Sequence, residues 1–439
     1  MISLALLLAA SFDAAAMAQT SATLNALGPH PFGSPRNQAA AQFVAAKLRE
    51  GGLVRTTVDE FTFEGLPGMN VVATLPGRTD RLLIVATHLD SPRDAQDFSG
   101  RSRSLALLIE IGRQAARLRP AKTWILASFD GGESKGEGFA HYLAALGKNR
   151  SLIDGVVVVE AAGLSDASPV PYLIAPSCAR ETLSPKRGIA GREMVATALG
   201  GLPASLEFSF DDPGIGLLTQ PFIRAFETEC DPLAARAHAS GLGVILVADR
   251  AFSARFLTRN ASVRPSGGAA PDHAAARLGE VAFATIQGVD MSAASSPQSD
   301  SWLVIGRSVW PGWLIVLAGI ATLLPGLVAL RSEGVRLAFR ISWSFAFAAV
   351  LFAEPEVALF AGALPNLLPP SWPRKFFILT LVPFGLLVSA GALGFARGQV
   401  TGSWLAGWVW ILLFAGFALL FGSFGARRKA AAKSRRGKR

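Results

Sequence analysis

The stretch LLIVATHLDSPRDAQDFSG, residues 82–100, joins an apolar run to a group of chemically active side chains. The apolar run is typical of a buried strand, and it ends at His88. Asp90 follows two positions later, and Asp97 comes shortly before a Ser-Gly pair. A carboxylate at the end of a buried strand needs a partner, because burying an unpaired charge is costly. The stretch therefore predicts a functional site, with a helix cap as the plainer interpretation of Asp97.

The same pattern recurs further along the chain. The run ILASFDGGE, residues 125–133, ends with Asp130 and Glu133, and a run of four valines is closed by Glu160. Acids at several strand ends, together with one histidine, indicate a metal site, since imidazole and carboxylate oxygens suit zinc. A carboxylate that bridges two ions would allow a two-metal centre. We therefore expect these side chains to meet at one edge of a sheet.

The order of strand-like and helix-like segments predicts the fold class. Continuous Val/Ile/Leu runs alternate with amphipathic helical stretches, a pattern typical of a parallel-rich sheet covered on both faces. The expected strands are 69–77, 81–89, 123–130, 155–163 and 243–249, and the expected helices are 36–52, 102–118, 137–148, 191–199 and 267–286. We expect an α/β three-layer sandwich with a mostly parallel, mixed sheet. Ligands of such sheets bind at the carboxyl ends of the strands.

The apolar residues are concentrated in the last third of the chain. Hydrophobic residues make up 51% of the 439 residues, and the segment 302–425 holds few charged residues. The blocks 309–330, 376–396 and 404–425 are each long enough to span a membrane. The block 341–370 is either one helix or two short legs that turn at Glu354-Pro355-Glu356. The segment thus predicts an all-α transmembrane region of four to five helices.

The formal net charge of +10 points to the membrane rather than to nucleic acid. Eight Lys and Arg residues lie in the last thirteen positions, directly after the apolar region. Such a basic flank is typical of the cytoplasmic side of a membrane protein. We expect no nucleic-acid partner, a multi-pass membrane location and a soluble domain on the periplasmic or extracytoplasmic side.

The chain divides into five expected parts. They are a signal peptide or N-terminal anchor (1–18), a soluble domain (20–290), a polar linker (291–301), the transmembrane region (302–425) and a basic cytoplasmic tail (426–439). The first part is expected from an apolar stretch and a cleavage-like Ala16-Met17-Ala18. Cys178 and Cys230 either form one disulfide in an oxidising compartment or stay thiols.

The order of the motifs resembles that of the co-catalytic di-zinc aminopeptidases. The matching elements are His88-Leu-Asp90, Asp97-Phe-Ser-Gly, Phe129-Asp-Gly-Gly-Glu133 and the valine run that ends at Glu160. This family includes bacterial leucyl aminopeptidase, glutamate carboxypeptidase and glutaminyl cyclase relatives. The resemblance covers about residues 25–290. Apolar spans after the domain make the layout most similar to the endoplasmic-reticulum metallopeptidase branch.

The resemblance implies a role for each matched residue. It makes His88 a ligand of the first zinc ion and Glu160 another ligand of that ion. Asp97 would bridge the two ions, and Glu133 would be a ligand of the second. Asp90 would orient His88, the supporting role that outer carboxylates have at zinc sites. In that mechanism the metal activates a water molecule for attack on a peptide bond.

Two positions depart from the family pattern. Gly132 stands where the family has the glutamate that acts as general base, and loss of a general base typically costs about 10²–10⁴ in rate. Leu257 stands where the family has the last histidine ligand. His238 and His273, the histidines closest to that position, are interpreted as ordinary helical or loop residues. We therefore expect one or two zinc ions, with an incomplete second site.

Three functions follow from these observations. The first is a membrane-anchored zinc-dependent exopeptidase, a hydrolase of the aminopeptidase type acting on peptides or small amides. The alternative is a catalytically impaired pseudo-peptidase that acts as a binding or scaffold protein, because of Gly132 and Leu257. The third is transport through the spans, which offer few polar residues besides Glu354 and Glu356. Metal analysis and aminopeptidase assays distinguish the first two.

Overall fold

The computed structural model of the chain describes residues 12–91, 98–132, 135–161, 171–174, 191–210, 231–249, 272–292, 302–305 and 307–311. The chain divides into two compact units. The first comprises residues 1–216, 227–299 and 306–308, and the second comprises 217–226, 300–305 and 309–439. The α/β domain described below belongs to the first unit.

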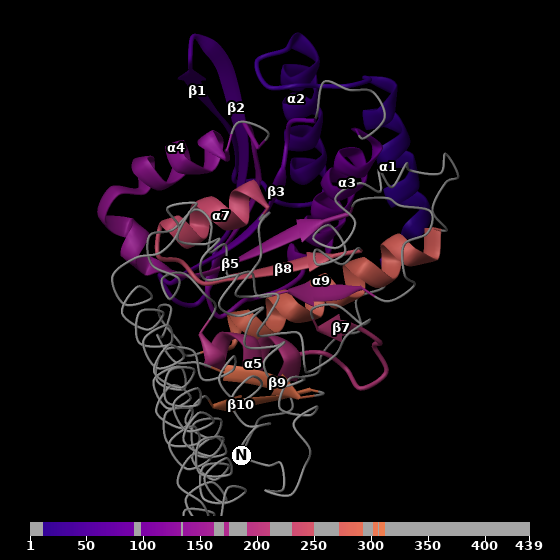
Figure 1. Cartoon of the computed structure of the whole chain (residues 1–439). Coiled ribbons are helices and arrows are strands. Elements are labelled where there is room, and N and C mark those ends of the chain that lie inside the picture. Colours follow the sequence, from indigo (N-terminus) through magenta and orange to yellow (C-terminus); the bar gives the residue numbers. More distant parts are fainter. Residues whose placement is uncertain are drawn as a thin grey trace, which may run out of the picture. The chain divides into compact units, whose positions relative to one another are not determined.

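Among the described residues, eight strands form one mixed sheet, the middle layer of the domain (Figure 1). Their order across the sheet is β1-β2-β4-β3-β5-β8-β6-β7. The central strands β4, β3, β5 and β8 run parallel, as do β6 and β7, and the other neighbours are antiparallel. The predicted mostly parallel, mixed sheet is therefore confirmed. The strands are β1 (Thr56–Phe63), β2 (Leu66–Leu75), β3 (Leu82–His88), β4 (Thr123–Phe129), β5 (Ile153–Glu160), β6 (Tyr172–Ile174), β7 (Ser209–Phe210) and β8 (Val244–Ala248).

The central strands are apolar along their whole length because both of their faces are covered. Every residue of β5 and β8 is buried, and in β3 and β4 only the first residue is partly exposed. The edge strand β1 instead alternates between more and less exposed residues. Such alternation is typical of a strand that packs on one face only.

Helices cover both faces of the sheet (Figure 1). On one face, α4 (Glu137–Leu146) and α7 (Pro232–Ala239) pack on the central strands, with Phe139, Leu143 and Leu233 in the shared apolar core. On the other face lie α2 (Pro35–Glu50), α3 (Phe98–Ala115) and α9 (Asp272–Asp290). Helix α1 (Ala14–Ala26) packs on α3 and α9, α5 (Arg192–Gly200) packs on α9, and the 3-10 turn η1 (Gly147–Leu152) joins α4 to β5. The predicted three-layer sandwich is therefore confirmed.

Helix α1 crosses the boundary that the sequence predicted between a leader and the soluble domain. Met17, in the middle of the predicted cleavage-like site, is buried in the domain. The ring of Phe12 packs edge-on against Phe283 of α9, with 6.0 Å between the centroids. The described part of the domain thus includes residues 12–26, whereas the sequence analysis placed its start at residue 20; the leader expected at 1–18 stays a prediction.

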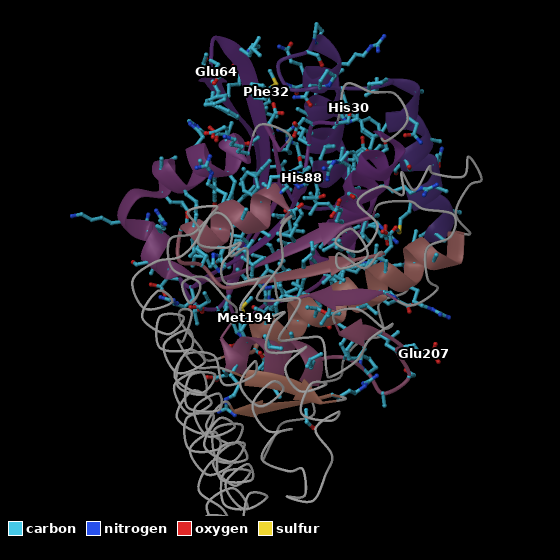
Figure 2. All side chains as sticks on the ribbon, in the orientation of Figure 1. His30, Phe32, Glu64, His88, Met194 and Glu207 are labelled. Carbon is cyan, nitrogen blue, oxygen red and sulfur yellow. The ribbon has the colours of Figure 1, made fainter. Side chains whose placement is uncertain are left out.

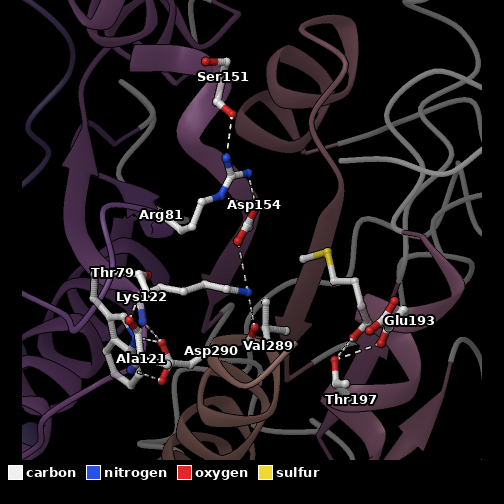
Figure 3. A network of polar contacts seen from close by, with 12 residues as sticks. Thr79, Arg81, Ala121, Lys122, Ser151, Asp154, Glu193, Thr197, Val289 and Asp290 are labelled. Atoms are coloured by element: carbon white, nitrogen blue, oxygen red, sulfur yellow. Dashed lines mark hydrogen bonds and ion pairs between the residues drawn. The ribbon is translucent and has the colours of Figure 1, made fainter. Parts of the chain in front are cut away.

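A polar network closes the sheet at the amino ends of its parallel strands (Figure 3). Asp154 of β5 pairs with Arg81 and, at 3.3 Å, with the Lys122 ammonium group. The Asp290 carboxylate, at the end of α9, accepts bonds of 2.7–2.8 Å from two backbone N–H groups just before β4 and from the Trp124 indole. We call these residues the base network: Arg81, Lys122, Trp124, Asp154 and Asp290. It attaches α9 to the sheet.

The start of the segment 302–425, predicted to be transmembrane and helical, forms strands in the structure. Strands β9 (Trp302–Ile305) and β10 (Ser308–Pro311) form a separate two-stranded sheet, where the sequence predicted the start of a helical region. Residues 312–425, which hold most of the predicted spans, and the tail 426–439 lie outside the described residues. In the described segments, no helix is both long and apolar enough to span a bilayer.

Candidate functional site

The sheet brings three of the predicted site residues to one edge. His88 ends β3 and Glu160 ends β5, and these two strands are parallel neighbours. Asp90 follows β3 by two positions. All three side chains are buried, with 0%, 6% and 1% of His88, Glu160 and Asp90 exposed. Figure 2 shows His88 in the interior of the domain.

Several other predicted residues lie outside the described residues. They are the predicted ligands Asp97 and Glu133, the Leu257-Thr258 pair and the two cysteines, Cys178 and Cys230. Of the two histidines interpreted as ordinary, His238 is fully buried on α7, and the backbone of His273 belongs to α9. The site is therefore described from the side chains around His88 and Glu160.

His88 is paired with Asp231, a residue that the sequence analysis did not single out. The Nε2 atom of His88 lies 2.6 Å from Oδ2 of Asp231, and each side chain is at most 2% exposed. Asp231 caps α7, because its Oδ1 atom accepts the N–H groups of Leu233 and Ala234 at 2.9 and 3.0 Å. Helix α7 packs next to β3, which brings the cap of the helix to the end of the strand.

The neighbours of Asp231 keep it ionised. Burial alone would raise the pKa of this carboxyl group, but the charge and hydrogen bond of His88, the Ala234 N–H and the charge of Arg101 together hold the pKa below its ordinary value. An ionised carboxylate can only accept hydrogen bonds. The His88 Nε2 atom is therefore the donor, and the other ring nitrogen, Nδ1, has no hydrogen-bond partner among the described residues.

Gly132 fits tightly between His88 and Asp90. Its N–H donates to Oδ1 of Asp90 at 2.7 Å. A Cβ atom on Gly132 would lie 2.0 Å from the His88 Nδ1 atom, far inside van der Waals contact. In the structure Asp231, and not Asp90, thus holds the ring of His88, while Asp90 holds the backbone of Gly132. The ring of His88 thus fills the space in which the side chain of a glutamate at position 132 would begin.

Glu160 lies beside a cation. The guanidinium of Arg101, on α3, is 3.6 Å from Oε1 of Glu160, and the two side chains are 14% and 7% exposed. Glu160 is the residue that the resemblance makes a ligand of the first zinc ion. Its carboxylate therefore already has a positively charged neighbour from the protein.

His30 is a further buried histidine close to this edge. Its backbone exchanges two hydrogen bonds with Ser91, just after Asp90, and its Nδ1 atom bonds the carbonyl oxygen of Gly28 at 3.0 Å. Burial is the main cause that lowers the pKa of His30. The ring is thus neutral near pH 7, and Nε2 carries a lone pair with no hydrogen-bond partner in the described part of the chain.

Asp130, which directly follows β4, is a buried acid of this edge, and its pKa is raised. Burial raises the pKa of Asp130 to about 7, the charge of Asp90 adds to this, and hydrogen bonds from Met69, Gly131 and Asn37 oppose it. These bonds measure 2.7–2.9 Å. They connect Asp130 to α2 and β2, and so give it a structural role.

The described residues do not fit a zinc centre of the kind that the resemblance implies. Two ligands of one tetrahedral zinc ion lie roughly 3.3 Å apart. The Nε2–Oδ2 distance between His88 and Asp231 is 2.6 Å, which is that of a direct hydrogen bond. A ligand histidine also offers a lone pair, but Nε2 carries a proton and Nδ1 faces Gly132. Within the described ranges, no three His, Cys, Asp or Glu side chains gather closely enough to hold a metal ion.

Three residues of the site were missed by sequence reasoning. Asp231 precedes a proline at a helix start, which is the pattern of a simple cap. Arg101 is one of several arginines on an amphipathic helix, and His30 lies in the turn GPHPFGS. The run of strong turn residues around His30 was the one local signal that could have identified a special loop.

No protein-family model matches the sequence, and no curated protein matches it at a significant level. Solved structures with a similar arrangement include the LapA aminopeptidase of Legionella pneumophila, with 12% identity and a TM-score of 0.46 over 65% of this chain and 73% of that one. The aminopeptidase of Aneurinibacillus sp. strain AM-1 has 12% identity and a TM-score of 0.45, over 66% and 96% of the two chains. A glutaminyl cyclase of an Acidobacteriales bacterium has 19% identity and a TM-score of 0.45, over 64% and 96%.

Proposed function

We propose that the domain is a peptidase-like binding module that holds a peptide or small amide at the carboxyl edge of its sheet without hydrolysing it. This is the alternative function expected from the sequence. The surroundings of His88 carry the proposal, because they remove the features that a metal-dependent hydrolase needs.

The pairing of His88 is the single most important observation. Its Nε2 atom donates to Asp231, and its Nδ1 atom lies against Gly132. Nε2 then has no lone pair for a metal ion, and Nδ1 is covered by the backbone of Gly132. The partner is not easily released, since Asp231 is also fixed as the cap of α7.

The absence of a carboxylate at position 132 supports the same conclusion. A glycine cannot accept a proton, and the space in which a longer side chain would stand is filled by the ring of His88. The Asp90 carboxylate accepts the Gly132 N–H. Position 132 itself therefore offers no general base for a water molecule.

The chemistry of the edge suits a peptide-like ligand. The carboxyl edge of parallel strands is where ligands of open α/β sheets bind. The bare Nε2 atom of neutral His30 accepts a hydrogen bond, which an amide or amine N–H supplies. The predicted spans and the basic tail support anchoring of this module to a membrane, with the domain on the extracytoplasmic side.

A zinc-dependent exopeptidase is the second candidate. It is favoured by His88, Asp90 and Glu160, three buried side chains that end or follow the neighbouring strands β3 and β5. In that case His88 would have to leave Asp231 in order to bind the ion. The two candidates thus differ in whether the His88–Asp231 pair is permanent.

The test uses the full chain purified in detergent. Zinc content is measured by plasma emission after incubation with excess zinc and gel filtration, and hydrolysis is measured with leucine p-nitroanilide and tetra-alanine. Binding of leucinamide and tetra-alanine is measured by thermal shift. We expect no stoichiometric zinc and no turnover, but a rise in Tm with at least one ligand, which His30→Phe removes.

The variants His88→Ala and His141→Ala separate the candidates. His141 lies on the surface of α4, with its side chain 39% exposed, and serves as the matched control. Turnover in the parent protein that needs zinc and disappears only in His88→Ala would establish the exopeptidase instead. A lack of any ligand-induced shift would contradict the binding module.

A further inference from the structure

Arg101 brings a permanent positive charge to the edge of the sheet that carries the acids. It lies in the first turn of α3, which begins at Phe98. A cation near the amino end of a helix is disfavoured by the helix dipole. The position therefore needs a compensating negative partner from another part of the fold.

Glu160 is that partner. The two groups approach to 3.6 Å across the ends of α3 and β5, and both are largely withdrawn from water. A buried carboxylate without a cation is costly, and so is a buried cation without a carboxylate. Each residue therefore makes the burial of the other possible.

The acids of this edge need a counter-charge. Asp90, Glu160 and Asp231 are all buried there. The resemblance assigns the neutralisation of Glu160 to zinc, whose ligand set does not fit the described residues. An arginine provides one positive charge at every physiological pH and requires no cofactor.

Resting on the proposed function, we infer that Arg101 is the built-in counter-cation of Glu160 and takes the place of a divalent metal ion beside this carboxylate. The domain consequently folds without metal. Removal of the guanidinium leaves the buried Glu160 carboxylate without this cation.

The experiment compares Arg101→Met with Arg103→Met in the full chain purified in detergent. Arg103 lies on the same helix, carries the same charge and has no ion-pair partner among the described residues. Tm is measured with EDTA and with zinc, and zinc binding is measured by calorimetry. In EDTA we expect Arg101→Met to lower Tm by about 5–10 °C. We expect zinc to restore none of that loss, because in the described segments no three His, Cys, Asp or Glu side chains gather closely enough to hold a metal ion.

A double variant that removes both charges keeps the test decisive if Arg101→Met does not fold. The double variant Arg101→Met/Glu160→Gln removes both charges, so it should recover stability relative to either single variant. A double variant no more stable than the singles would overturn the inference. So would an Arg101→Met chain with the same Tm as Arg103→Met.

The parent chain distinguishes this inference from the proposed function. Zinc-dependent turnover by the parent chain contradicts the binding module, whatever Arg101→Met does. A parent chain without zinc or turnover, combined with unchanged behaviour of Arg101→Met, contradicts the role of Arg101 alone.

Discussion

At the amino ends of the parallel strands, Asp154 and Asp290 each meet two or more donors. At the carboxyl ends, His30 and His88 each keep a buried ring nitrogen that has no hydrogen-bond partner among the described residues. The two ends belong to the same strands and are equally withdrawn from water. The difference therefore lies in how the polar groups are paired, and not in how deeply they are buried.

This contrast indicates what each end does. A fully paired buried network fixes one arrangement of the chain. An unpaired buried polar group needs a reason to persist, and such exceptions are expected at functional sites. We therefore assign stability to the base network and propose ligand binding for the edge around His88. Three substitutions test this division, from the largest expected effect to the smallest.

The largest effect is expected from Asp154→Ala in the base network. The substitution leaves the Lys122 ammonium, on a side chain only 6% exposed, without its carboxylate. Breaking one side of a buried pair costs about 3–5 kcal/mol. We expect Tm to fall by roughly 6–15 °C, measured by circular dichroism of the purified chain.

Glu50→Ala is the control for this prediction. Glu50 pairs with Lys47 on the surface of α2, and both side chains are well exposed. Exposed pairs are worth less than about 1 kcal/mol. Equal losses in the two variants would remove the special role of the amino ends.

An intermediate effect is expected from Gly132→Ala at the carboxyl edge. The new methyl group would meet the His88 ring, so the ring or the backbone must shift, at a cost of about 1–3 kcal/mol. His88→Ala should relieve the clash, and the double variant should be more stable than the sum of the single losses predicts. Denaturant unfolding of the four proteins measures this coupling.

Gly200→Ala controls for the loss of a glycine. A Cβ atom there would contact nothing within 4 Å, so we expect no loss of stability. If Gly132→Ala behaves like Gly200→Ala, the tight fit around His88 is not present in solution.

The third test concerns Asp130, whose titration is expected to change the free energy of unfolding only gradually, by a small amount for each pH unit. Its pKa of about 7 in the folded state lies above its ordinary value of 3.8, so the folded chain binds a proton that the unfolded chain releases. The stabilisation is complete below about pH 4 and is lost as the pH rises through 7, by at most about 1.4 kcal/mol per pH unit.

Asp130→Asn should remove this slope between pH 4 and 7. The readout is the slope of unfolding free energy against pH, because the substitution also changes hydrogen bonds and hence the absolute stability. A slope that stays the same in Asp130→Asn would show that Asp130 is ionised throughout this range.

The centre of the fold could be predicted because its signals are long and local. Four consecutive valines in β5 and the apolar run of β3 need burial on both faces, whatever surrounds them. Strands β6 and β7 have only three and two residues, and β6 pairs with β8 far along the chain. Such short strands are defined by their partners, so no local pattern identifies them. Strand β1 does carry a local signal, the alternation of TTVDEFTF, although the expected strands did not include it.

The site could be predicted only where an active side chain directly follows such a run. His88, Asp90 and Glu160 meet that condition, and the structure has them at one edge. Asp231 does not, since its sequence context shows only the cap of α7. Its contact with His88 depends on how α7 packs beside β3, which is decided by the whole core.

The packing of α1 on α9 has a consequence for the order in which the chain can fold. Phe12 packs against Phe283 of α9, a helix that ends at Asp290. The side of α1 that faces α9 therefore stays uncovered until almost the whole domain has been synthesised, whereas the side that packs on α3 can be covered earlier. A nascent chain that stops before α9 presents the uncovered side to chaperones and proteases, and completes this part of its core only when α9 arrives.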